Sequence, residues 1–149
     1  MSTRPRTLLG LSCLLVAGCH DTLDRVADKA EATCHENAPC VVNVTDVTGF
    51  DWDKMYIFRG GAQRAYIEKT IGLPFPDWEE LSEQVLFVRG NEIVKSESYD
   101  DFEANGERVV GVNFSDHAYY EIPRSSPGLI VRIYHDPKQR FYAIEPVTR

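Results

Sequence analysis

The sequence predicts an α+β domain with one curved, mostly antiparallel sheet of about seven or eight strands and one main helix on a face. Short segments of alternating apolar and polar residues follow one another from residue 41 to the C-terminus. Most of their connections are so short that consecutive strands must be antiparallel. One well-marked helical pattern interrupts these segments, and a thinner one precedes them.

The thinner helical pattern begins just after residue 20. Leu23, Val26, Ala27 and Ala30 are spaced i, i+3, i+4 and i+7, which places them on one helical face. Asp21 stands where it can cap the start of the helix. Because the apolar stripe is thin, two interpretations stay open: a short N-terminal helix packed on the sheet, or a mobile tether.

Two strands and the main helix come next. Alternation predicts strands near residues 41–47 and 53–59. Residues 62–71 then have helical spacing. Gly72 follows at the position that favours a left-handed cap, and Pro74 prevents continuation.

The C-terminal half is rich in strands. An irregular crossing over residues 73–83 leads into them, and Gly90-Asn91 forms a two-residue hairpin turn between the first two. The predicted strands lie near residues 85–88, 92–99, 110–114, 120–122, 129–134 and 140–144.

The N-terminal segment has the layout of an export signal. Arg4 and Arg6 precede an apolar stretch over residues 8–17, and small residues follow. The stretch is about half as long as the roughly 20 residues that a membrane-spanning helix needs. We therefore expect residues 1–18 to direct secretion and then to be removed.

The residues Val16-Ala17-Gly18-Cys19 resemble the lipobox of bacterial lipoproteins. The resemblance implies that Cys19 receives a diacylglyceryl group and anchors the mature chain in a membrane. His20 follows it where some Gram-negative bacteria use Asp as an inner-membrane signal. The implied location is the cell envelope, facing the periplasm, with the outer membrane favoured over the inner.

The interpretation as a lipoprotein divides the chain into three parts. A signal peptide covers 1–18, a lipidated tether or helix with a cysteine loop covers 19–40, and the α+β domain covers 41–149.

The mature chain is strongly acidic. The whole chain has 16 basic and 23 acidic residues, and removal of Arg4 and Arg6 leaves 14 basic residues and a net charge of −9. Such a surface repels phosphate backbones, so nucleic acid is not an expected partner. It also repels anionic lipids, so the lipid on Cys19 must hold the protein at the membrane.

Two cysteines remain after Cys13 leaves with the signal and Cys19 is acylated. In an oxidising compartment Cys34 and Cys40 are expected to form a disulfide, although free thiols are an alternative. Closing this short loop contributes about 2 kcal/mol in the chain-entropy model.

No metal or other cofactor is expected. A site built from Cys34, His35 and Cys40 lacks a fourth ligand at zinc-finger spacing. Residues 101–106 partly match a calcium loop, but Val112 stands where a bidentate Glu is needed.

The segment Phe50-Asp51-Trp52-Asp53-Lys54-Met55-Tyr56-Ile57-Phe58 resembles a strand motif, F-x-W-D-K-x-Y-x-F, of small and mostly uncharacterised secreted bacterial lipoproteins. The helix that ends at Gly72 and the strand over residues 85–88 extend the resemblance to about residues 41–146. Many members have a Pro-Tyr pair where this chain has Gly60-Gly61. The resemblance implies no catalytic residue.

Four residues in and near this motif are candidates for contact with a partner. Trp, Tyr and Arg dominate the energetic hot spots of protein interfaces. The candidates are Trp52, Tyr56, Arg59 and Trp78. The alternative is that these side chains pack within the domain.

We expect a non-enzymatic, membrane-anchored periplasmic lipoprotein that binds another protein, for example as an immunity or inhibitor protein. The first alternative is a carrier or sensor of a small apolar or lipid ligand. The second is a small hydrolase that uses His117 or His135. Ser115, Asp116 and His117 are adjacent, but neighbours on a strand point to opposite faces and cannot form a relay.

Replacing Cys19 by Ser is predicted to abolish incorporation of a fatty acid into the protein and to release it from the membrane fraction. Metabolic labelling followed by fractionation measures both effects. Cys13→Ser is the matched control and should be labelled like the wild type. An unlabelled wild-type protein would refute the prediction.

Overall fold

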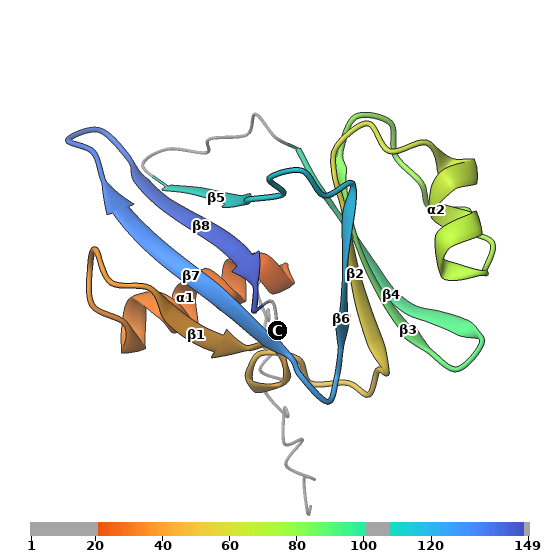
Figure 1. Cartoon of the computed structure of the whole chain (residues 1–149), viewed down its shortest axis with the longest axis horizontal. Coiled ribbons are helices and arrows are strands. Elements are labelled where there is room, and N and C mark those ends of the chain that lie inside the picture. The colour runs from red at the N-terminus through yellow and green to blue at the C-terminus, as the bar shows by residue number, and fades with distance from the viewer. Residues whose placement is uncertain (1–20, 101–107, 148–149) are drawn as a thin grey trace, which may run out of the picture.

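Eight strands form two four-stranded sheets in the computed structural model, which describes residues 21–100 and 108–147 (Figure 1). Sheet A contains, in spatial order, β1 (Cys40–Asn43), β7 (Gly128–His135), β8 (Arg140–Pro146) and β5 (Arg108–Val112). Sheet B contains β4 (Glu92–Tyr99), β3 (Glu83–Arg89), β2 (Lys54–Phe58) and β6 (Tyr119–Pro123). Two α-helices, α1 (Thr22–Thr33) and α2 (Arg64–Ile71), and a 3-10 turn, η1 (Val44–Asp46), complete the described elements.

The α+β class and the mostly antiparallel pairing are confirmed, but the expected single curved sheet is corrected to two sheets. The chain changes sheets on either side of β6, through residues 113–118 and 124–127. The second connection is flanked by Pro123 and Pro127, and proline cannot donate a hydrogen bond to a sheet ladder. Strand β5 pairs in parallel with β8, which is far away in the sequence.

The main core lies between the two sheets and α1. In Figure 1 sheet A lies on the left and sheet B on the right. Each sheet contributes one face, and α1 contributes its apolar stripe. The buried side chains from the strands are Val42, Met55, Ile57, Val85, Phe87, Ile122, Leu129, Val131, Ile133, Tyr142 and Ile144.

A second core covers the other face of sheet B. Helix α2 packs there through Ile67, and Phe58 and Leu86 face it from β2 and β3. The helix ends at Gly72, whose φ of +74° confirms the predicted left-handed cap. Sheet B is thus covered on both faces, which agrees with the nearly continuous burial of β3.

Helix α1 is a packed element of the domain, which decides between the two interpretations left open by its sequence. Leu23, Val26, Ala27 and Ala30 are all buried in the main core. The helix lies against strands of sheet A. Its burial makes it part of the same core as the sheets.

The first turn of α1 is fastened to sheet B by Glu97, a buried carboxylate on β4. Thr22 donates to Glu97 from its amide at 3.0 Å and from its hydroxyl at 2.9 Å, and Lys95 pairs with the carboxylate at 2.5 Å. Tyr99 donates to Glu97 at 2.9 Å and accepts from the Leu23 amide at 3.0 Å. Burial and the neighbouring carboxylate raise the pKa of Tyr99, so the phenol keeps its proton.

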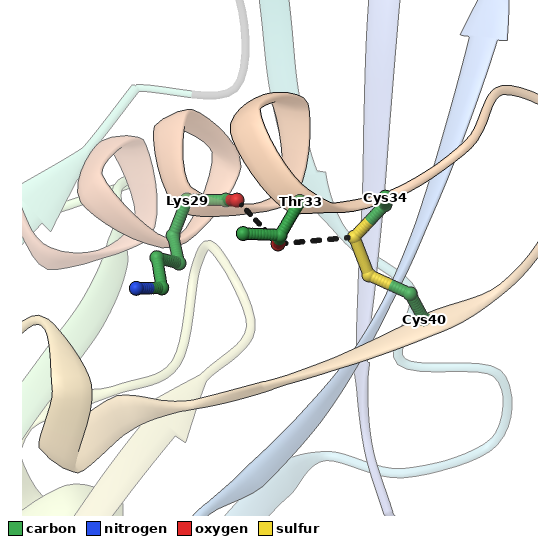
Figure 2. Close-up of a disulfide and its surroundings, with 4 residues drawn as sticks. All are labelled: Lys29, Thr33, Cys34 and Cys40. Carbon is green, nitrogen blue, oxygen red and sulfur yellow. Dashed lines mark hydrogen bonds between the residues drawn. A yellow bond between two sulfur atoms is a disulfide. The ribbon is translucent and has the colours of Figure 1, made fainter.

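The predicted disulfide between Cys34 and Cys40 is confirmed. It joins the end of α1 to the start of β1, with the two Cα atoms 5.9 Å apart (Figure 2). Next to it, the Thr33 hydroxyl donates to the Lys29 carbonyl at 2.7 Å. The bridge therefore fixes the C-terminal end of α1, as Glu97 fixes its N-terminal end.

Glu97→Ala is predicted to lower the free energy of unfolding by about 3 kcal/mol, because it leaves the amide and hydroxyl of Thr22, the Tyr99 hydroxyl and Lys95 without their buried partner. Chemical denaturation measures the change. Glu92→Ala, on the same strand but paired only with Arg89 at the surface, should cost less than about 0.5 kcal/mol. Equal effects of the two substitutions would contradict the assignment.

Candidate functional site

Two of the four aromatic and basic residues predicted to contact a partner lie in the interior. Trp52 is 1% exposed, and its indole donates to the Thr48 hydroxyl at 3.1 Å. Tyr56 is 5% exposed and belongs to the core under α2. Their burial agrees with the alternative, that these two side chains pack within the domain.

The other two lie nearer the surface, on the α2 side of the molecule. The Arg59 guanidinium donates to the Ser115 carbonyl at 2.9 Å and lies 5.5 Å from the centre of the Phe114 ring. Trp78 is half-buried, and its indole donates to the Ala62 carbonyl at 2.9 Å. The structure therefore does not bring the four predicted residues together on one exposed surface.

A different surface has the properties of a contact site. It is the outer face of sheet A, the face directed away from the main core. An antiparallel sheet with one solvated face normally has polar residues there. The outer face instead carries apolar side chains from each of its strands. They are Val41, Val109, Ile130, Tyr134, Phe141 and Ala143, with Val147 just after β8.

The outer face concentrates the exposed apolar area of the described residues. Four of their six exposed large hydrophobic side chains lie on it: Val41 at 59%, Tyr134 at 48%, and Phe141 and Val147 at 37% each. Scattered exposed apolar residues are ordinary, but a contiguous group on one surface indicates an interaction site. We therefore treat the outer face as the candidate site.

Strand register brings these side chains into two groups. Tyr134 lies opposite Phe141, and Phe141 lies opposite Val109, so the three form one row across the sheet. Val41 lies opposite Ile130 in a second row.

Val147 extends the second row. Its amide donates to the Gly128 carbonyl at 3.1 Å, and its side chain lies over Gly128. A Cβ atom on Gly128 would lie 3.0 Å from Val147 and 3.1 Å from Val41. Glycine at this position therefore lets the two valines approach each other.

Between the two apolar rows lies a row formed by Arg132, Ala143 and Gly111. Glu145 lies opposite Ile130 and continues the second row. Arg132 pairs with Glu145 at 3.1 Å, and the Asn113 amide donates to the same carboxylate at 3.3 Å. Gly111 lies opposite Ala143, and these small residues help to form a shallow depression of about 190 Å³. The site is thus a largely apolar surface that carries the Arg132–Glu145 ion pair and has a shallow depression beside it.

The sequence contains a signal for this face that composition alone does not reveal. Residues 129–134 are apolar at both odd and even positions, except for Arg132. A strand of this type has apolar side chains on both faces, so it is either covered twice or exposes one apolar face. The alternation expected of a half-buried strand is absent.

The two histidines considered for hydrolysis lie in different settings. The His117 ring lies 5.1 Å from the ring of Tyr120. His135 lies 3.2 Å from a carboxylate oxygen of Glu36.

Other predicted features fall partly outside the described residues. Cys19 and the signal segment precede them, and the partial calcium loop over residues 101–106 lies in the gap. Within residues 21–100 and 108–147, no group of three or more His, Cys, Asp or Glu side chains could hold a metal ion. No helix in those ranges is long and apolar enough to cross a membrane.

Comparison of the chain with protein-family models, with curated proteins and with solved structures gave no match.

Trp52→Ala is predicted to lower the free energy of unfolding by about 4 kcal/mol, because it opens a cavity between Phe87 and the rest of the main core. Tyr134→Ala removes an exposed ring and should cost less than about 1 kcal/mol. Thermal or chemical unfolding distinguishes the two. A small effect at Trp52 would contradict its assignment to the core.

Proposed function

We propose that this protein is a lipid-anchored protein of the bacterial cell envelope that binds another protein through the outer face of sheet A. The gathering of four exposed apolar side chains on that face carries the proposal. An immunity protein or inhibitor that captures an envelope-directed protein is its most concrete form.

The composition of the outer face suits a protein partner. Tyr134 and Phe141 are aromatic, and they are neighbours on adjacent strands. Arg132 adds a residue type that is enriched at binding hot spots, and its pairing with Glu145 fixes its position in advance. Preorganised side chains lose less conformational freedom when a partner binds.

Charge supports a basic partner. The exported chain has a net charge of −9, whereas the outer face carries one balanced ion pair. The overall field would accelerate the approach of a cationic protein, and the apolar rows would then hold it. Association should therefore slow as salt is added, while dissociation changes less.

The anchor supplies the location. The lipobox-like residues before Cys19 support attachment to a membrane and exposure to the periplasm, with the outer membrane favoured. A partner is then sought among envelope or periplasmic proteins.

Tyr134→Ala combined with Phe141→Ala is predicted to weaken partner capture from envelope extracts by about thirtyfold or more, which corresponds to the loss of about 2 kcal/mol at a hot spot. Quantitative pull-down with tagged protein measures the loss. Tyr66→Ala is the matched control, because Tyr66 is similarly exposed at 41% but lies on α2.

The control variant should capture the same protein as the wild type. Capture that is unaffected by the double substitution would refute the assignment of the outer face. Failure to enrich any protein above a lipidated control would refute the binding function itself.

A further inference from the structure

The connection between the predicted anchor and the folded domain is very short. Cys19 precedes Thr22 by three residues, and a fully extended chain spans at most about 3.6 Å per residue. Thr22 is itself fixed, because its amide and hydroxyl both donate to the buried carboxylate of Glu97. A lipid on Cys19 therefore holds the start of α1 within about 11 Å of the anchor.

An unusually exposed leucine lies near the strand residues that bind the first turn of α1. Tyr99, which binds the first turn of α1, pairs with Glu83 at the start of β3. Two residues earlier in the chain is Leu81, and the intervening Ser82 donates to Asp100 at 2.7 Å.

Leu81 has two uncommon properties. Its side chain is 74% exposed, the largest value among the exposed large hydrophobic residues that the structure describes. Its φ of +72° is in the left-handed region, which a leucine rarely adopts. A strained backbone that presents an apolar side chain to the outside is characteristic of functional positions.

The opposite end of α1 lies one helix length away from Thr22. The helix has 12 residues and is therefore about 18 Å long. Its last turns lie beside the turn between β7 and β8, because Glu31 pairs with Arg140 and Glu36 lies 3.2 Å from His135. Lys138 lies in that turn, beside the end of α1 that is farther from Cys19 in the sequence.

From this geometry we infer that the end of the domain at which α1 begins lies against the lipid bilayer, and that Leu81 contacts the bilayer. The inference rests on the lipid anchor of the proposed function and adds an orientation to it. Leu81 has acidic neighbours: Glu79 and Glu80 precede it in the chain, and Asp100 accepts a hydrogen bond from Ser82. Because these carboxylates would be repelled by anionic lipids, we expect contact with a zwitterionic bilayer.

The test uses the chain from Cys19 onward, which includes all the described elements. Its Cys19 thiol is coupled to a maleimide lipid in vesicles of phosphatidylcholine brominated on the acyl chains, while Cys34 and Cys40 are protected by their disulfide. Bromine quenches tryptophan only at close range. The tryptophan fluorescence of Leu81→Trp is compared with that of Lys138→Trp. The emission of the unsubstituted protein, which has two tryptophans, is subtracted from each.

The added emission of Leu81→Trp should fall about twofold or more in brominated vesicles, and that of Lys138→Trp should be unchanged. Inserting about twenty Gly and Ser residues between His20 and Asp21 should relieve the quenching at position 81, because such a linker is a long flexible coil.

Equal quenching at the two positions, or quenching at position 81 that the linker leaves unchanged, would overturn the inference. Chemical coupling makes these results independent of whether cells acylate Cys19. Fatty-acid labelling of the wild-type chain tests that part of the proposed function separately.

Discussion

The buried carboxylate of Glu97 connects the two halves of this fold. Helix α1 packs on sheet A, yet its first turn is bound by a side chain of sheet B. Burying a charge is costly unless it is compensated, and here Thr22, Tyr99, Lys95 and the positive end of the helix dipole all compensate it. Glu97 therefore fixes the first turn of α1 to sheet B, while the apolar stripe and the disulfide hold the rest of the helix against the main core.

Local sequence signals predicted the elements well, because each signal acts over a few residues. Gly72 ends α2 and Gly90 turns between β3 and β4, both with positive φ, as their positions indicated. Pairing was harder to predict. The parallel partnership of β5 with β8 depends on strands separated by β6 and β7, and no local pattern encodes it. Strand β1 is also shorter than expected, because Val44 begins a 3-10 turn.

The candidate site was missed for a related reason. Strands β2 and β7 share a pattern: each has apolar residues on both faces, over Met55–Phe58 in β2 and over residues 129–134, except Arg132, in β7. In β2 the second face is covered by α2 and Phe75, so Tyr56 is buried. In β7 the second face is exposed, so Tyr134 is at the surface. Only the tertiary structure shows which face is covered.

An exposed apolar sheet face favours association, either with a second copy of the chain or with a different protein. Two copies of this chain would each bring a net charge of −7, and their mutual repulsion opposes self-association at low ionic strength. The Arg132–Glu145 pair keeps the face itself nearly neutral. A basic partner experiences the opposite long-range force and meets the same apolar rows. In the proposed function, charge would therefore select the partner, and the aromatic pair of Tyr134 and Phe141 would provide the contact area.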